Sequence, residues 1–291
     1  MSFTELYKKN KRVFSFEFFP PKRPEDLPAT KALIARMSAL QPDFMTVTYG
    51  AGGGTRARTQ ELVSYIVNEL KCPAAAHLTC VHHTVEEVER MLDSFAADGI
   101  NKIVALRGDP SNTLEGAGSL FPGFSCARDL VRYVKSKGSF HMAVAAYPEV
   151  HPDAKSSLED LLYLKEKVDA GAELILTQVF FDPEIYFAFV KEAQRVGIQV
   201  PIVPGILPIG NLKQLEIFTS KCGATIPNRL QDDLRMIGND RVAVQAFGTS
   251  YAARMCEKLL EGGAPGIHFY TLNKSMQVEE VIKVLRGALP N

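Results

Sequence analysis

The sequence predicts an α/β protein in which a closed, eight-stranded parallel β-barrel is surrounded by helices, a (β/α)8 or TIM barrel, as a single domain over residues 1–291. Three observations support this prediction. Apolar segments rich in β-forming residues recur about every 30 residues, and a helical pattern follows each of them. Several helical patterns run into a glycine, which commonly ends a helix. Parallel strands need such long crossovers, and a closed barrel leaves no unpaired strand edge.

The predicted strands share a short apolar run that ends in polar or turn-forming residues, and they cover residues 13–19, 43–49, 74–80, 101–107, 140–147, 173–179, 200–206 and 266–272. The predicted helices share apolar residues at spacings of three and four, and they cover Leu27–Leu40, Arg58–Leu70, Thr84–Asp98, Ala127–Lys137, Ser157–Ala170, Pro183–Val196 and Ala246–Glu261. One long interval before the last strand predicts extra helices over about 212–240. We find no linker or low-complexity tract that would divide the chain.

Composition excludes several classes of function. The chain has 33 basic and 33 acidic residues, and its 46% hydrophobic content suits a soluble globular protein. Because no basic run is present, we expect neither nucleic acid nor an anionic membrane as a partner. No apolar run approaches the roughly 20 residues that span a bilayer, and the first residues lack the layout of a signal peptide. The cytoplasm is therefore the expected location.

The cysteines do not predict a disulfide framework or a metal site. There are five, an odd number, and they are widely scattered. The segment from His77 to His83 contains Cys80 and three histidines, which are metal-ligand types. Because no second cluster has recognisable ligand spacing, we predict reduced, mostly structural cysteines and no metal.

Glu17 is the most informative residue, because it is a lone carboxylate in an apolar strand that ends at Pro20 and Pro21. Strand alternation places Val13, Ser15, Glu17 and Phe19 on one face and Phe14, Phe16 and Phe18 on the other. Burial near apolar surface would raise the pKa of Glu17 and suit it to act as a general acid. The alternative is an ordinary salt-bridged or solvated glutamate at a strand end.

Polar residues also collect where the other strands end, which in such a barrel is where active sites lie. They include Thr48, His77, Arg107 with Asp109, Tyr147 to His151, Gln178 and Lys274. Acid, base, amide and cation at so many strand ends predict an active site in the barrel mouth.

The ligand could be a dinucleotide. Asp160 and Lys167 lie seven residues apart on one helix face, where an acid could bind ribose hydroxyls and a cation a pyrophosphate. A solvated charge pattern is the alternative for this pair. The glycines at 50 and 52–54 lack the spacing of a phosphate-binding P-loop.

The chain resembles the 5,10-methylenetetrahydrofolate reductase family, in its short bacterial form. The resemblance runs in one register from Phe14 to about Leu285. It rests on eight motifs in order: Phe16-Glu17-Phe18-Phe19-Pro20-Pro21-Lys22, Val47-Thr48-Tyr49-Gly50-Ala51, Ala76-His77-Leu78-Thr79-Cys80, Leu106-Arg107-Gly108-Asp109, Tyr147-Pro148-Glu149-Val150-His151-Pro152, Thr177-Gln178-Val179-Phe180-Phe181, Pro204-Gly205-Ile206-Leu207-Pro208 and His268-Phe269-Tyr270-Thr271-Leu272-Asn273.

The resemblance implies a flavoprotein of one-carbon metabolism and methionine biosynthesis that reduces methylenetetrahydrofolate to methyltetrahydrofolate. FAD would be the cofactor, and NADH or NADPH the co-substrate in a ping-pong reaction. The resemblance also implies a chain without a C-terminal regulatory domain, and we expect a homo-oligomer.

The resemblance assigns residues to three roles. The catalytic residues would be Glu17, as general acid, and Asp109. FAD would be held by Thr48, His77, Arg107, Gly108, Asp109, Ala127, Asp160 and Lys167. The folate or nicotinamide would be bound by Glu17, Gln178, Gln214, Phe218 and Lys274. Two positions depart from the family pattern, since Lys274 replaces an arginine and Cys126 a tyrosine.

Two other functions fit the same fold. One is a different barrel enzyme, such as a flavin-dependent amino-acid dehydrogenase or a pterin-binding methyltransferase domain. The other is a flavin subunit that takes electrons from a protein partner instead of a nicotinamide.

Overall fold

The computed structural model describes residues 1–10, 12–49, 55–108 and 121–288, apart from the side chains of Gln214, Phe218 and Ala288. Its strands form one parallel sheet in the order β7-β6-β5-β4-β3-β2-β1-β9-β8. They are β1 (Val13–Phe18), β2 (Phe44–Val47), β3 (Ala74–Thr79), β4 (Lys102–Leu106), β5 (His141–Ala146), β6 (Leu174–Thr177), β7 (Ile202–Val203), β8 (Gly205–Ile206) and β9 (Gly266–Tyr270). Every one lies inside a range that the sequence predicts.

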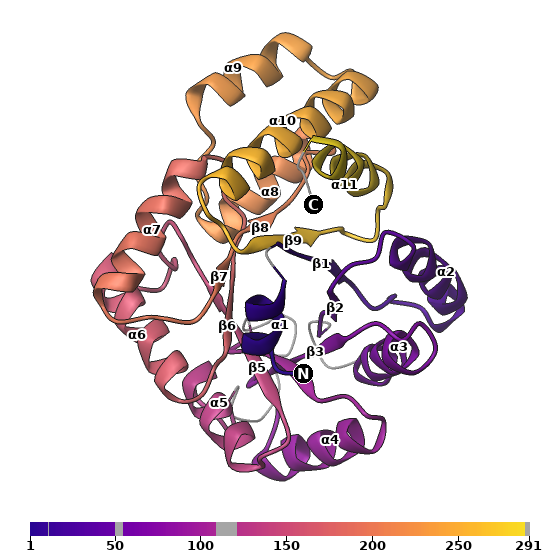
Figure 1. Ribbon diagram of the computed structural model, residues 1–291, viewed down its shortest axis with the longest axis vertical. Coiled ribbons are helices and arrows are strands. Elements are labelled where there is room, and N and C mark those ends of the chain that lie inside the picture. Colours follow the sequence, from indigo (N-terminus) through magenta and orange to yellow (C-terminus); the bar gives the residue numbers. More distant parts are fainter. Residues whose placement is uncertain (11, 50–54, 109–120, 289–291) are drawn as a thin grey trace.

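The ninth strand arises because Pro204 divides the predicted strand 200–206 into β7 and β8. Proline has no N–H to give to a sheet. β7 pairs with β6, whereas β8 pairs with β9. The Pro204 carbonyl accepts a hydrogen bond from the His268 N–H at 3.0 Å, so the ring of strands continues past the interruption. The predicted TIM barrel is therefore confirmed, and Figure 1 shows its helices around the ring.

The helices on the outside confirm the predicted pattern, with small changes at their ends. They are α2 (Leu27–Ser38), which follows the 3-10 turn η1 (Pro24–Asp26), α3 (Arg56–Asn68), α4 (Val85–Ala97), α5 (Ala127–Ser136), α6 (Ser157–Asp169), α7 (Pro183–Arg195) and α10 (Arg241–Glu261). The largest change is in α10, which begins five residues before the predicted Ala246. Asp240 explains the earlier start, because its carboxylate accepts hydrogen bonds from the Val242 and Ala243 N–H groups.

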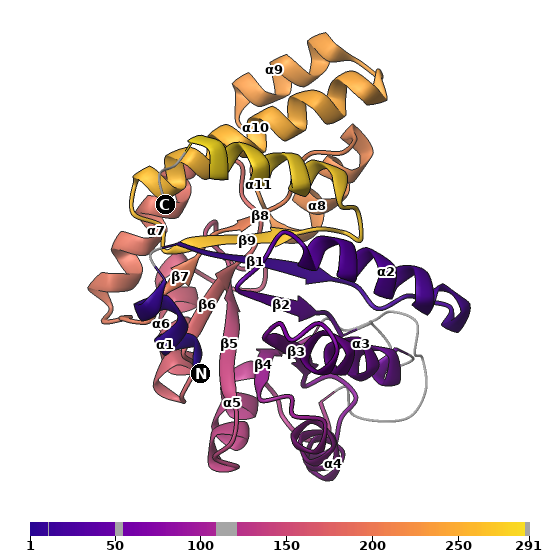
Figure 2. The ribbon, with the colours of Figure 1, turned by 45° about the vertical axis from the view of Figure 1, so that its right-hand side comes forward.

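The extra segment forms two helices, α8 (Leu212–Cys222) and α9 (Asn228–Ile237). They share a small apolar core with the start of α10, which includes Leu215, Leu230 and Val244. Figure 2 shows α9 and the adjoining end of α10 projecting beyond the ring of helices. The expectation of extra helices over about 212–240 is thus confirmed.

Two helices were not predicted, α1 (Phe3–Lys9) and α11 (Met276–Ala288). α1 lies over the N-terminal end of the barrel, in the middle of the ring in Figure 1. Its Phe3 ring packs against Phe44 inside the barrel at a centroid distance of 5.4 Å, and the Phe3 N–H donates to Glu173. Because α1 closes this end, ligands reach the barrel interior from the opposite end.

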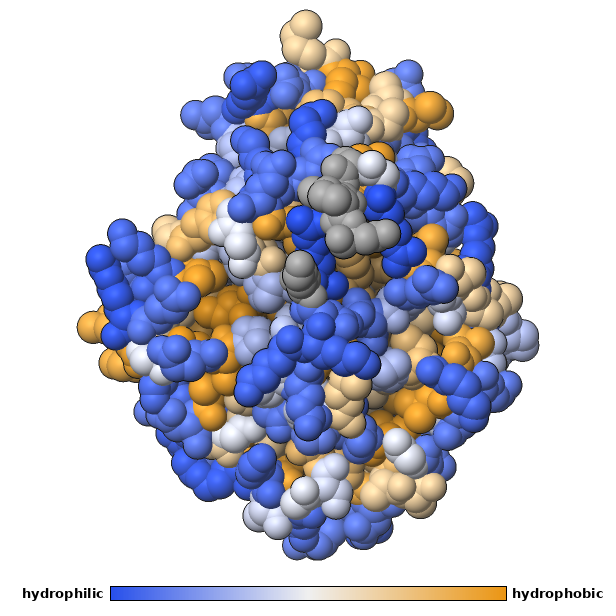
Figure 3. Space-filling view, viewed as in Figure 1, coloured by the Kyte–Doolittle hydropathy of each residue, from blue (hydrophilic) through white to orange (hydrophobic). Residues whose placement is uncertain are grey.

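Figure 3 shows the molecule from the same side as Figure 1, with hydrophilic residues over much of this face and apolar groups between them. Over the described ranges, no helix combines the length and the hydropathy needed to cross a bilayer.

Candidate active site

Glu17 lies near the C-terminal end of β1 with its side chain inside the barrel, and it is only 6% exposed. Its neighbours across the sheet are Thr46 on β2 and Tyr270 on β9. Phe16 and Phe18 point outward and pack in the core between the strands and the helices. The predicted strand alternation is therefore confirmed, and Glu17 lies on the barrel side.

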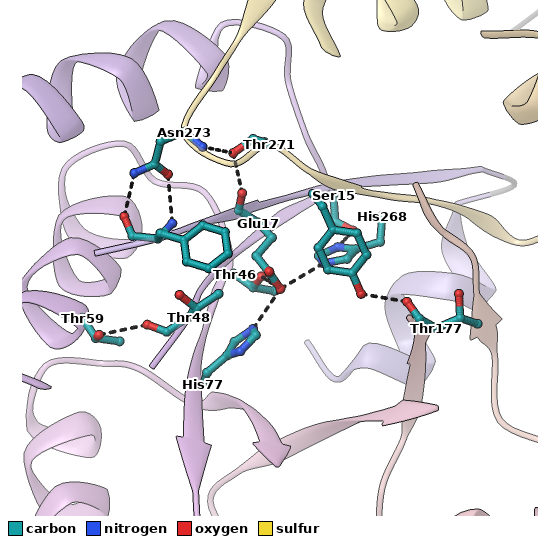
Figure 4. A network of polar contacts seen from close by, with 12 residues as sticks. Ser15, Glu17, Thr46, Thr48, Thr59, His77, Thr177, His268, Thr271 and Asn273 are labelled. Carbon is teal, nitrogen blue, oxygen red and sulfur yellow. Dashed lines mark hydrogen bonds and ion pairs between the residues drawn. The ribbon is translucent and has the colours of Figure 1, made fainter. Parts of the chain in front are cut away.

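Two histidines flank the Glu17 carboxylate. Oε2 lies 3.3 Å from His77 Nε2 and 3.5 Å from His268 Nε2. Thr46 Oγ1 lies 3.5 Å from the same oxygen. On its far side, the His268 ring bonds through Nδ1 to Ser15 Oγ at 2.8 Å. Figure 4 shows the carboxylate between the two imidazoles, and we call these five residues the acid cluster.

The acid cluster corrects the expectation that burial raises the pKa of Glu17. Burial does act in that direction, but His77 and His268 outweigh it and lower the pKa of Glu17 to about 2. The carboxylate therefore contributes stability above pH 4.5, the ordinary pKa of a glutamate, and this contribution is lost as the pH falls from 4.5 to about 2. The lowered pKa favours the carboxylate form of Glu17, so a proton that it passes on would come from its neighbours.

Hydrogen bonds hold the loops beside Glu17 in place. Thr271 Oγ1 donates to the Glu17 carbonyl at 2.6 Å, and Asn273 pairs with both backbone groups of Phe19. Leu272 and Asn273 both have positive φ, a conformation that these bonds keep in place. The Tyr270 hydroxyl donates across the barrel to the Thr177 carbonyl at 2.7 Å. The acid cluster is therefore surrounded by backbone segments that these hydrogen bonds hold in place.

The residues assigned to FAD by resemblance form two groups around the mouth. In the first, at the ends of β2, β3 and β4, Thr48 Oγ1 is buried and has no hydrogen-bond partner in the part of the chain that the structure describes. His77 belongs to this group as well as to the acid cluster. Arg107 forms an ion pair with Asp153 at 2.8 Å. Gly108 has φ +83°, and a Cβ there would meet Val81 at 2.8 Å, so only glycine fits.

The second group lies on α5 and α6. Lys167 Nζ donates to the Ala145 carbonyl at 2.6 Å, and burial lowers the pKa of Lys167 from 10.5 to about 8. Asp160 accepts from the His151 N–H at 2.8 Å. α5 begins at Ala127 without a side-chain cap, because Cys126 at the N-cap donates to Asp129 instead. The sequence left a solvated Asp160–Lys167 pair as the alternative, but Lys167 is only partly exposed and its ammonium is held by the Ala145 carbonyl.

These two groups fit a flavin dinucleotide. An uncapped helix N-terminus and a partly exposed ammonium are both suited to a pyrophosphate. The unpartnered Thr48 hydroxyl offers a hydrogen bond to a polar ring or sugar atom. The residues present are therefore chemically suited to hold FAD.

The residues assigned to the folate or nicotinamide are spread over several elements. Gln178 follows β6, and its Oε1 accepts from the Val179 N–H at 2.9 Å. Lys274 is exposed and lines a small pocket with Leu207 and Tyr270. Gln214 and Phe218 lie on α8, although their side chains are outside the description. Asp109 lies outside the described residues.

The sequence counted Tyr270 among the polar residues at the strand ends, but it assigned no role to Tyr270, Ser15 or His268. Ser15 shares the Glu17 face of β1, and His268 and Tyr270 alternate on β9 with the same period. Strand alternation therefore carried a signal. A closed barrel implies that the first strand pairs with the last, but the sequence did not give the register that brings Ser15 opposite His268.

Comparisons with known proteins agree on one family. The family model described as methylenetetrahydrofolate reductase matches residues 2–286. The chain is 41% identical over 262 residues to the 5,10-methylenetetrahydrofolate reductase of Escherichia coli (strain K12), covering 90% of this chain and 86% of that protein. It is also 41% identical over 272 residues to a protein of Oryza sativa subsp. japonica named probable methylenetetrahydrofolate reductase (NADH). That match covers 90% of this chain but 46% of the rice protein, so the chain spans about half the length of its plant relatives.

Solved structures give the same fold at lower identity. A Clostridium thermocellum protein described as binding two copies of 5-methyl-5,6,7,8-tetrahydrofolic acid aligns with a TM-score of 0.66 at 20% identity, covering 98% of this chain and 97% of that one. The dihydropteroate synthase of Xanthomonas albilineans aligns with a TM-score of 0.54 at 13% identity, covering 97% and 95% of the two chains. At these identities the likeness concerns the fold alone.

Proposed function

Because the chain belongs to the methylenetetrahydrofolate reductase family, we propose that it reduces 5,10-methylenetetrahydrofolate to 5-methyltetrahydrofolate, with NAD(P)H as electron donor and FAD as cofactor. The acid cluster is the observation that carries this proposal. Opening the five-membered ring of the substrate requires a proton at its N10 atom, and the cluster places a carboxylate and two imidazoles inside the barrel near the C-terminal end of β1.

The proton transfer follows from the geometry of the cluster. The lowered pKa of Glu17 favours its carboxylate form, which lies beside His77 and His268. Either imidazole can hold a proton at Nε2, and Ser15 Oγ contacts the other ring nitrogen of His268 at 2.8 Å. We infer that a bound folate excludes water, which favours transfer of the proton to Glu17 and from there to N10. The acid is then the coupled cluster rather than an isolated glutamate.

The chemistry that FAD would supply when bound is hydride transfer between NAD(P)H and the folate, in a ping-pong reaction. The chain's part would be to hold the pyrophosphate at Lys167 and the N-terminus of α5, and the flavin side at Thr48, His77, Arg107 and Gly108. Asp109, which follows Gly108 in the sequence, would stay ionised and favour the cationic form of the opened folate.

The names of relatives support NADH as the electron donor and methylenetetrahydrofolate as the substrate. The rice protein is named as NADH-dependent, and the Escherichia coli protein is named for 5,10-methylenetetrahydrofolate. Gln178 at the end of β6, Lys274 beside the pocket, and Gln214 and Phe218 on α8 would bind the folate or the nicotinamide. A homo-oligomer stays a prediction, which sedimentation velocity would test.

The visible absorption spectrum of the purified protein tests the proposal. Recorded without oxygen, flavin bands should bleach with NADH or NADPH and return when methylenetetrahydrofolate is added. Bleaching without return would favour a different barrel enzyme. A yellow protein that neither nucleotide bleaches would favour a flavin subunit with a protein donor. A protein that takes up no FAD would contradict the proposal.

Lys167→Met should raise stability and weaken cofactor binding. The lowered pKa of Lys167 shows that the fold disfavours its charged form, so the cofactor-free protein gains stability as pH rises from about 8 to 10.5. Removing this charge should raise the melting temperature of the cofactor-free protein by about 2–4 °C. The dissociation constant of FAD should rise about tenfold or more, because a pyrophosphate would lose its cation.

The control is Lys165→Met, on the same helix, which removes a cation paired with Asp169 at the surface. Neither the melting temperature nor the dissociation constant of FAD should change much in this variant, because exposed ion pairs contribute little to stability. Melting curves and FAD titrations of both variants decide the matter. Unchanged FAD affinity in Lys167→Met would remove Lys167 from the cofactor site.

A further inference from the structure

The loop after β5, residues 147–154, is tied to three parts of the barrel mouth. Asp153 pairs with Arg107 at the end of β4. The His151 N–H donates to Asp160 on α6. The third tie is made by Glu149, and it reaches the connection between α8 and α9, residues 223–227. The first two ties go to residues that would hold FAD, and the third goes to the connection that follows α8, the helix of Gln214 and Phe218.

The Glu149 tie uses one carboxylate for three hydrogen bonds from one residue. The Thr225 N–H lies 3.1 Å from Oε1 and 3.0 Å from Oε2, and the Thr225 hydroxyl also donates to Oε2. The two residues are 76 positions apart in the chain. Such a contact does not follow from local structure. It fixes the α8–α9 connection against the β5–α6 loop.

The backbone next to Glu149 has a strained conformation that needs neighbouring contacts to hold it. Val150 has φ +78°, which a β-branched residue rarely adopts. Such conformations persist where surrounding contacts hold them, and they are often found at functional sites. Here the neighbouring contacts are the Glu149 tie on one side and the His151–Asp160 bond on the other.

The tied connection also lies near the acid cluster. Cys222, the last residue of α8, is buried in a small cluster with Val179 and Leu207, and Tyr270 packs against this cluster. Tyr270 is the cross-strand neighbour of Glu17. The end of α8 therefore covers the rim beside Glu17, while Thr225 reaches the loop on the cofactor side.

We propose that Glu149 is a positioning residue, which through Thr225 holds α8, the helix of Gln214 and Phe218, in register with the cofactor side of the mouth. This inference rests on the proposed function and adds to it a residue that acts without touching substrate. Loss of the tie should loosen α8 and raise the KM for folate, while FAD binding and kcat change little.

The test uses the full-length holoprotein and the variants Glu149→Ala and Thr225→Val. The control is Glu159→Ala, whose carboxylate accepts from the Lys155 N–H four residues away and reaches no other element through that bond. Hydrogen exchange over residues 212–227 should speed up about tenfold in Glu149→Ala, less in Thr225→Val, and not in the control. The KM for methylenetetrahydrofolate should rise about five- to tenfold in Glu149→Ala, with kcat within about twofold.

The double variant adds a further check, because two residues that act only through each other should not have additive effects. Unchanged exchange in Glu149→Ala would overturn the inference. Faster exchange with unchanged KM would also overturn it, by making the tie structural only. A wild-type protein that binds FAD but does not turn over methylenetetrahydrofolate would instead overturn the proposed function, and the positioning role with it.

Discussion

Glu17→Gln is expected to lower the rate of folate reduction by about 10²–10⁴-fold, the usual contribution of a general acid. Glutamine keeps the size of the side chain and can still contact His77 and His268, but it cannot receive a proton from them and pass it on. FAD binding and NAD(P)H oxidation should remain, because neither requires protonation of the folate. Stopped-flow measurement of each half-reaction separates the two effects.

The matched control is Glu173→Gln at the opposite end of the barrel. Glu173 is also paired with a histidine, His141, at 2.9 Å, but it lies beside α1 and far from the mouth. Folate reduction in this variant should equal that of the wild type. If Glu17→Gln reduced folate at the normal rate, the acid cluster could not be the source of the proton.

Gly248→Ala should destabilise the protein by about 1–3 kcal/mol, the usual cost of overpacking. Gly248 lies in the middle of α10, where a Cβ would stand 2.1 Å from the Ile209 carbonyl oxygen. Backbone cannot move aside as a flexible side chain can. The same oxygen accepts a hydrogen bond from Gln277 on α11 at 2.9 Å, so a shift of Ile209 would weaken that bond as well.

Gly287→Ala should instead stabilise the protein. Gly287 lies on α11 with nothing within 4 Å of a Cβ, and alanine is the better helix former. This variant should gain up to about 1 kcal/mol. Urea unfolding of both variants measures the difference. Equal stabilisation in the two would show that α10 does not approach Ile209 closely.

The fold could be predicted from the sequence because each strand and most outer helices carry their own periodic signal. α11 carried one too, since Val278, Val281, Ile282 and Leu285 are spaced for one buried helix face. α1 has only seven residues, and its clearest signal is the capping box between Ser2 and Glu5. Helices this short owe their existence to packing, in this case against the barrel interior.

The site could be predicted in part, because active residues of a parallel barrel follow its strands. The ionisation of Glu17 could not be predicted, since its pKa depends on His77 and His268, which lie 60 and 251 positions along the chain from Glu17. Apolar neighbours in the sequence suggested a raised pKa, whereas neighbours in space lower it. The Glu149–Thr225 tie was hidden for the same reason, because it joins two loops.

The pairing of β1 with β9 has a consequence for how the protein is made. The bond between Ser15 and His268 spans 253 positions of the chain, across the seam where the first strand meets the last. Contacts between such distant residues form slowly, because a long loop must close before they are gained. During synthesis on the ribosome, β1 cannot pair with β9 until residues 266–270 have emerged. The acid cluster is thus assembled only when the ring shuts, so a partly folded chain would carry no complete proton donor.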